Sequence, residues 1–170
     1  MSIAAILGEL EHEHATTRRV LERVPEEKLS WKPHPKSMSL GELALHVAQS
    51  PGYIASKWAL EDVVRLGGSG DSSPKATSTK EILAAHDASV AQTREALTQL
   101  GDEGLKKMWK AEANGVTVFE MPKAALVRSI VLNHTYHHRG QLSVYLRLLD
   151  VPVPSIYGPS ADENPMAART

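Results

Sequence analysis

Apolar side chains recur at three- and four-residue steps over four long stretches of the chain, which is the period of an amphipathic α-helix. The four stretches are residues 2–24, 39–66, 78–100 and 123–150. Pro25 ends the first stretch. Ser39 and Ser78 each precede a glutamate by three residues, as in a capping box that begins a helix. The pattern therefore predicts an all-α chain built from four helices.

The first helix has a seam of inward positions that advance by alternating steps of four and three residues, as in a helix bundle. The seam consists of Ile3, Leu7, Leu10, His14, Thr17, Leu21 and Val24. Charged residues off the seam, among them Glu9 and Glu13, are expected in solvent. His14 is either a core histidine with a backbone or water partner, or a side chain that faces the bundle interior.

The connections between the helices carry turn signals of different kinds. Residues 67–74 are rich in Gly and Ser and predict a flexible connection, which lacks the Gly-Lys-Ser/Thr ending of a phosphate loop. Asn114-Gly115 separates two alternating runs within residues 106–121, which predicts a short hairpin before the last helix. Trp31 is expected to cover an end of the core. The Pro-rich tail 151–170 is expected to be either an extended strap or partly disordered.

Three histidines lie within five residues of the last helix, at His134, His137 and His138. Positions four apart share one face of a helix, so His134 and His138 can offer two nitrogen ligands to one metal ion. His137 could replace His138 as an i, i+3 partner of His134, but the four-residue step is better aligned with the apolar stripe. The alternative is a set of core histidines without metal.

A stable metal site needs a third ligand, and His46 is the best-placed candidate because it lies on the inward side of the second helix. Glu42 precedes His46 by one turn and could act as a base, but its capping role at Ser39 explains it more simply. Tyr53 could supply a hydroxyl group from a similar face. The candidates for catalytic residues are Glu42, Tyr53, Gln141 and His14.

Length, charge and composition further restrict the possible functions. The 170 residues are enough for one domain, which we expect to span residues 1–170 with a core of about 2–150. A formal net charge of -1 without a basic stripe argues against a nucleic-acid partner. The absence of cysteine leaves His, Asp, Glu or water as metal ligands. The chain has neither a signal-peptide pattern nor a membrane-spanning apolar run, so we expect a cytoplasmic protein.

An ordered set of motifs runs through nearly the whole chain. Residues 41–46 read Gly-Glu-Leu-Ala-Leu-His, and residues 134–141 carry His134-x3-His138-Arg139-Gly140-Gln141. Residues 31–33 (Trp-Lys-Pro), 36–39 (Lys-Ser-Met-Ser) and 153–159 complete the set. In this order and number, the motifs resemble the DinB/YfiT-like family.

This resemblance implies a four-helix bundle with long crossover connections, commonly a homodimer. It also implies one divalent metal per chain, most often nickel or zinc with iron or manganese as further options, held by three histidines that map to His46, His134 and His138. Some relatives are thiol-dependent transferases or isomerases, and others are hydrolase-like. We therefore expect a metal-dependent hydrolase or thiol-dependent transferase that acts on a small molecule. The alternative is a metal- or small-ligand-binding bundle without turnover.

Overall fold

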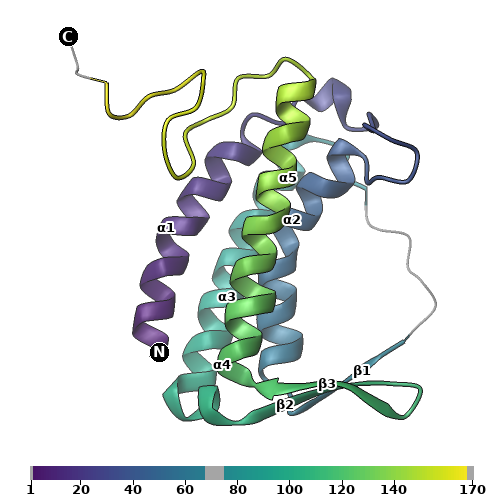
Figure 1. The fold of residues 1–170 in the computed structure, drawn as a ribbon, viewed down its shortest axis with the longest axis vertical. Coiled ribbons are helices and arrows are strands. Elements are labelled where there is room, and N and C mark those ends of the chain that lie inside the picture. The colour runs from purple at the N-terminus through teal and green to yellow at the C-terminus, as the bar shows by residue number, and fades with distance from the viewer. Residues whose placement is uncertain (1, 68–74, 168–170) are drawn as a thin grey trace.

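Four long helices form an upright bundle in the computed structural model, which describes residues 2–67 and 75–167 (Figure 1). They are α1 (Ile3–Leu21), α2 (Leu40–Ile54), α3 (Thr79–Lys106) and α5 (His134–Leu148). The side chains of Ser2, Ser39 and Ser78 cap the first three, and Ser39 forms the predicted capping box with Glu42. Within the described ranges, no helix is both long enough and apolar enough to cross a bilayer.

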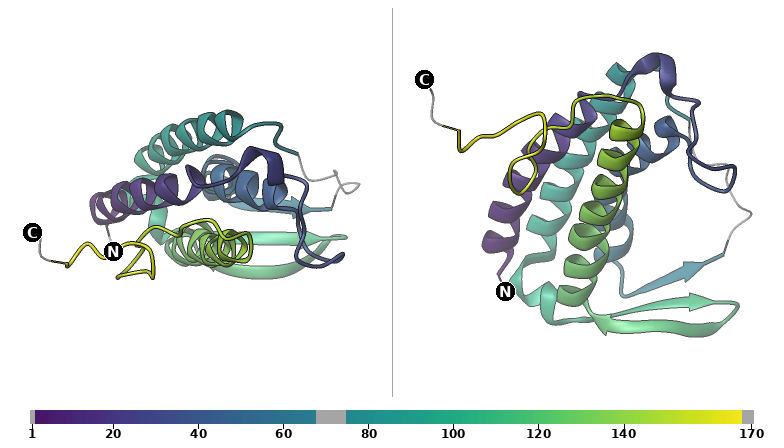
Figure 2. Two further views of the ribbon diagram at one scale, coloured as in Figure 1. Left: turned by 90° about the horizontal axis from the view of Figure 1, so that it is seen from above. Right: turned by 45° about the horizontal axis from the view of Figure 1, so that its top comes forward.

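The order of the helices around the bundle places α2 beside α5. The helix α3 packs against α1 and α2, and α5 packs against the same two helices from the other side. The view from above shows this four-sided arrangement, with α3 and α5 at opposite sides (Figure 2). Every helix can therefore bury one stripe against two neighbours.

The last helix is longer than α5 alone. A short α4 (Lys123–Leu126) continues through a π-helical stretch (Val127–Asn133) directly into α5, so the helix predicted over residues 123–150 is present as one rod. A second π-helical turn (Ala55–Ala59) follows α2. Such turns are uncommon and frequently lie at functional sites, and both of these flank the segments that carry the histidines.

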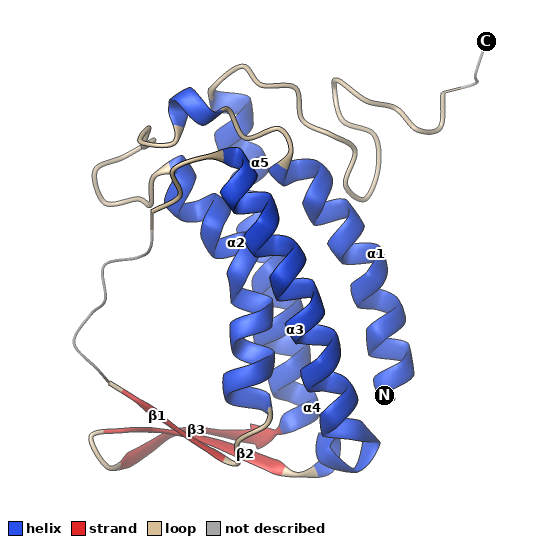
Figure 3. Ribbon diagram, turned by 180° about the vertical axis from the view of Figure 1, so that it is seen from behind, coloured by secondary structure: helices blue, strands red, loops and turns tan. Residues whose placement is uncertain are grey.

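A three-stranded sheet closes one end of the bundle, so the all-α prediction is wrong in part (Figure 3). It consists of β1 (Val63–Leu66), β2 (Met108–Ala113) and β3 (Val116–Pro122), in the order β1-β2-β3. The helix predicted over residues 39–66 is also wrong at its end, because β1 pairs in parallel with β2. The β-branched Val63 and Val64 suit a strand once a partner is available, and tertiary pairing overrides the helical pattern there.

The predicted hairpin is confirmed and joins β2 to β3. Asn114 and Gly115 have φ values of 51° and 78°, the left-handed conformation that a two-residue hairpin turn requires at both positions. The helix before the hairpin is interrupted directly after its predicted end at Leu100, because Gly101 has a non-helical φ of 63°. A further helical segment continues beyond this kink to Lys106. Residues 68–74 of the predicted connection lie outside the described residues.

Two main apolar clusters fill the bundle. One contains side chains such as Leu43, Ala44 and Leu142 from α2 and α5, and Trp31 covers it as predicted by packing against Tyr145. The other lies toward the sheet and includes Trp109, whose ring stacks on that of Trp58 at the end of α2.

A buried ion pair links α1 to α5. The side chain of Arg139 is 1% exposed and donates to the Glu13 carboxylate at 2.7 Å and to the Thr17 hydroxyl at 3.1 Å. The prediction that Glu13 is in solvent is therefore wrong, because its carboxylate is the counter-charge of a buried guanidinium. The hydroxyl of Tyr157 in the tail accepts from Arg139 at 2.6 Å and donates to Glu13 at 2.9 Å, so the tail completes this network.

The tail leaves the upper end of α5, passes the upper end of α1 and then extends away from the bundle (Figure 1). Its carboxylates form ion pairs with both helices, Asp162 with Arg147 and Glu163 with Arg19. Asp162 also accepts from the backbone N–H of Val153 at 2.8 Å. The tail is therefore held by these polar contacts, and it also packs on the apolar core through Val151, Val153 and Ile156.

His14 lies between α1 and α3, where its ring meets that of His86 edge-on with a centroid distance of 5.7 Å. Burial lowers the pKa of His14 to about 4, and the neighbouring His86 adds to this effect. Burial also lowers the pKa of His86, although the adjacent Asp87 opposes the shift. Both imidazoles are therefore neutral at pH 7.

Replacing Glu13 by Ala should lower the free energy of unfolding by about 3 kcal/mol, because it leaves the buried Arg139 guanidinium without its counter-charge. Urea unfolding at pH 7 measures this. Glu11→Ala is the matched control, since its ion pair with Arg94 is exposed and should contribute little. Equal midpoints for the two variants would contradict a structural role for the buried pair.

Acid should destabilise the fold partly through His14. Its folded pKa is depressed, so between about pH 6.5 and 4 the unfolded chain binds a proton that the folded chain does not, and stability falls as pH falls. The variant His14→Leu should therefore lose less stability than the wild type between pH 7 and 4.5 in thermal unfolding. The control His12→Ala, at an exposed position of the same helix, should follow the wild type. Identical pH profiles for wild type and His14→Leu would exclude this role.

Candidate metal centre

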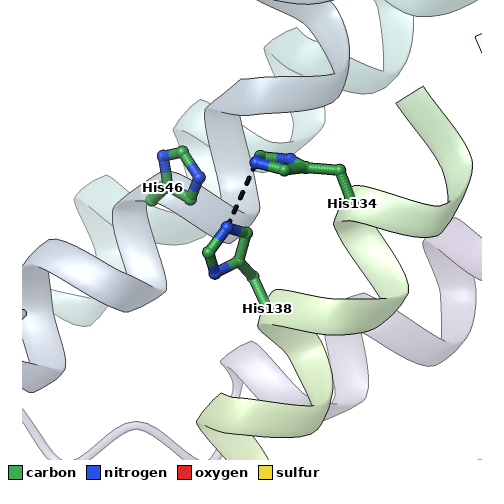
Figure 4. Close-up of side chains that lie close together, drawn as sticks. All are labelled: His46, His134 and His138. Atoms are coloured by element: carbon green, nitrogen blue, oxygen red, sulfur yellow. Dashed lines mark hydrogen bonds between the residues drawn. The ribbon is translucent and has the colours of Figure 1, made fainter. Parts of the chain in front are cut away.

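Three imidazoles converge at the middle of the α2–α5 interface, one from α2 and two from α5 (Figure 4). His46, His134 and His138 are each partly buried, and one ring nitrogen from each lies within 4.8 Å of the others. This is a set of groups that could hold a metal ion. The histidines that the sequence singled out are therefore brought together.

The periodicity of α5 sets the direction of its two histidines. The fully buried stripe of α5 is Thr135, Arg139, Leu142 and Leu146. His134 and His138 each precede a member of this stripe by one residue, which rotates them by about 100° toward its flank. They therefore face α2 at the edge of the core. Gln141, named above as a catalytic candidate, is exposed.

The spacing within the cluster suits a shared ion. The Nε2 atoms of His134 and His138 are 3.1 Å apart. Two nitrogens bound tetrahedrally at 2.0–2.1 Å are separated by about 3.4 Å, so little movement would be needed. The ring centroid of His46 is 4.4 Å from that of His138 and 5.0 Å from that of His134. The donor set therefore fits a divalent transition metal such as nickel or zinc.

The surroundings keep all three rings neutral, which is the protonation state that a metal ligand needs. Burial lowers the pKa of His134 to about 4, and His138 and His46 add to the shift. Burial is also the main cause of the lowered pKa of His46, followed by the proximity of His138. For His138, burial lowers the pKa more than the hydrogen bond to Gln141 raises it.

Gln141 fixes the orientation of one ring. The amide oxygen of Gln141 lies 2.7 Å from Nδ1 of His138 and can only accept, so Nδ1 carries the proton. The lone pair of His138 is then on Nε2, the atom that faces His134. A hydrogen bond from the far nitrogen of a ligand is the usual means by which proteins orient metal-binding histidines.

Two nitrogens of the cluster are buried without a hydrogen-bond partner among the described residues. They are Nε2 of His46 and Nδ1 of His134. A buried polar atom without a partner is costly, and native structures rarely keep one without a functional reason. For Nε2 of His46, coordination to an ion would remove that cost.

A cavity of about 720 Å³ opens beside the cluster, with His46 and His134 in its wall. The remaining lining comes from α2, its π-helical turn, α3 and the rod that leads into α5. Apolar side chains contribute most of the wall, among them Ile54, Trp58 and Ile130. Both the volume and the apolar character are typical of sites for small organic ligands.

The other candidate residues take different positions. Glu42 forms the predicted capping box with Ser39, and its pKa is lowered chiefly by the backbone N–H of Ser39. Tyr53 lines the cavity but is 56% exposed. His14 lies at the α1–α3 contact with His86 and outside the cluster. His137 is exposed and is not one of the three clustered residues.

Sequence reasoning missed the cavity wall that α3 and the π-helical turn supply. Ser89 and Gln92 line the cavity from α3, and Lys57 lines it from the turn after α2. The available signal was periodicity, since Ser50, Ile54 and Lys57 follow His46 at steps of four, four and three residues on one helical face. No comparable signal in the sequence marks Gln92.

Comparisons with known proteins agree with this architecture. The family model described as the DinB family matches residues 1–166. The uncharacterized protein YrdA of Bacillus subtilis (strain 168) is 29% identical over 154 residues, which cover 90% of this chain and 86% of that protein.

Two solved structures share the fold. A DinB-like protein from Bacillus cereus ATCC 10987 matches with a TM-score of 0.70 and 25% identity, over 92% of this chain and 98% of that chain. The DinB-like protein YjoA from Bacillus subtilis matches with a TM-score of 0.64 and 21% identity, over 86% of this chain and 92% of that chain. With a family match that extends over nearly all of its residues, this chain belongs to the DinB family.

Proposed function

We propose that this chain is a metal-dependent enzyme in which His46, His134 and His138 hold one divalent transition metal, with nickel or zinc as the first choices and iron or manganese as further ones. The observation that carries the proposal is the convergence of three neutral, partly buried imidazoles at the wall of a large cavity. Three protein ligands leave a coordination position open, as in catalytic sites, whereas structural zinc sites are closed by a fourth ligand.

The reaction class that fits is hydrolysis, or transfer of a low-molecular-weight thiol, on a small organic substrate. A divalent ion in an open site supplies Lewis acidity to such reactions. The chain's own residues would hold and orient the reactants. His46 and His134 border the cavity, Gln141 sets the tautomer of His138, and apolar side chains line the rest of the wall.

One observation favours a second candidate function, that of a metal- or small-ligand-binding protein without turnover. Among the described residues, the carboxylate that lines the cavity belongs to Glu42, and it is held by the N–H of Ser39 at 2.7 Å. A carboxylate held in this way is poorly placed to move a proton. Screening the metal-loaded protein against ester, amide and thiol-transfer substrates separates the two functions, because only the enzyme gives turnover that His134→Ala abolishes.

The homodimer implied by the family resemblance belongs to this proposal. Val144 and Leu148 lie one turn apart on α5 and are 57% and 58% exposed, which gives an apolar strip for contact between copies. Sedimentation equilibrium measures the mass directly, and a monomer at micromolar concentration would remove the dimer from the proposal.

Single substitutions should identify the ligands. The wild type should bind about one zinc or nickel ion per chain, and alanine at His46, His134 or His138 should weaken binding at least ~100-fold, since loss of an orienting partner alone costs 10–100-fold. Gln141→Leu should weaken binding about tenfold. Isothermal titration of chelator-treated protein measures the affinities, and elemental analysis measures the stoichiometry.

His137→Ala is the matched control for these variants. It removes an imidazole from the same turn of α5 that is exposed and outside the cluster, so binding should remain at the wild-type level. Unchanged affinity in His138→Ala, together with a loss in His137→Ala, would contradict the ligand assignment.

A further inference from the structure

The cavity beside the histidines has one wall formed by a single helical face. His46, Ser50, Ile54 and Lys57 all line it, and their spacing places them in a row along α2 and its π-helical turn. From one end of the row to the other, the side chains change from imidazole through hydroxyl and apolar groups to an ammonium group. The chemistry of this row indicates which kind of ligand the cavity would accept.

The polar middle of the row has an unused hydrogen-bonding group. Ser50 is 8% exposed, and its hydroxyl oxygen has no hydrogen-bond partner among the described residues. Because this side chain lines the cavity, its hydroxyl is available to a ligand there. A hydroxyl kept buried and unpaired is costly unless a bound molecule satisfies it.

The two charged groups that line the cavity differ in whether they are already paired. Lys57 and Glu42 are its charged lining residues apart from histidine. The Glu42 carboxylate accepts from the N–H of Ser39 and also lies 3.5 Å from the ammonium group of Lys32. Lys57 has no ion-pair partner in residues 2–67 and 75–167. The ammonium group of Lys57 is therefore the charge that remains for a ligand.

The two ends of the row are well separated. His46 and Lys57 are eleven residues apart, which corresponds to about 16 Å along a helix that rises 1.5 Å per residue. Ile54 and Trp58 from this segment and Ile130 from the rod leading into α5 provide apolar surface between them. A molecule that contacts both ends must therefore be elongated and mainly apolar.

We propose that the cavity binds an amphiphilic organic anion, with its apolar body along Ile54, Trp58 and Ile130 and its carboxylate or other anionic group at Lys57. The opposite end of the molecule, the reacting end, lies at the histidines. Only the placement of the reacting end at the histidines rests on the proposed metal function. Lys57 is thus a specificity-determining residue, because it selects anions over neutral molecules of the same shape.

Two fluorescent probes with the same aromatic skeleton test the proposal. 8-Anilinonaphthalene-1-sulfonate carries an anionic group, and N-phenyl-1-naphthylamine is its neutral counterpart. The wild type should bind the sulfonate more tightly than the neutral probe. Lys57→Met should weaken the sulfonate about fivefold, the size of a solvent-exposed ion pair, and leave the neutral probe unchanged.

Two further variants locate the effect. Lys80→Met removes an exposed charge from α3 outside the cavity lining and should change neither affinity. Ala88→Trp fills the cavity from the exposed side of α3 and should weaken both probes. Circular dichroism of each variant verifies that the fold is retained.

The proposal is overturned if the wild type binds the two probes equally or not at all. It is also overturned if Lys57→Met retains full sulfonate affinity, if Lys80→Met loses as much, or if Ala88→Trp binds as the wild type does. Repeating the titrations after chelator treatment separates this proposal from the metal function. If the protein binds no metal but Lys57→Met still weakens sulfonate binding, only the proposed metal function is contradicted. If metal binding is normal but Lys57→Met does not weaken sulfonate binding, only the proposed anion site is contradicted.

Discussion

The packing of α2 against α5 brings three partly buried imidazoles together at the edge of the apolar core. Burial keeps these rings neutral and leaves nitrogens of His46 and His134 without partners. A fold optimised only for stability would fill this position with apolar side chains. The cost of the unpaired Nε2 of His46 is understandable if the site has a ligand, and the adjacent cavity gives that ligand access to a substrate.

The rotation of α5 about its own axis must be fixed for the histidines to converge, and the buried ion pair with α1 supplies this restraint. Arg139 follows His138 directly, and its guanidinium binds Glu13 and Thr17 of α1. A charge-assisted, two-armed contact of this kind is more directional than apolar packing. Through Tyr157, the tail joins the same network, so α5 is held from one side by polar contacts while it presents imidazoles to α2 on the other.

The sequence allowed the helices, the hairpin and the three clustered histidines to be predicted, because these depend on local periodicity, capping and turn chemistry. It did not reveal β1, whose strand conformation depends on pairing with β2 far along the chain. Glu13 was missed because charged residues are usually solvated, although its spacing from Leu10 and Thr17 already fits a second inward stripe on α1. The cavity depends on gaps between side chains of separate helices, which no local pattern encodes.

Anomalous diffraction from crystals grown with nickel locates the bound ion without reference to activity. We predict one strong peak per chain at about 2.1 Å from a ring nitrogen of His46, His134 and His138, on the side of these residues that faces the cavity. A strongest peak that involves His137 or lies elsewhere on the molecule, or no peak at a metal concentration that saturates binding, would contradict this prediction.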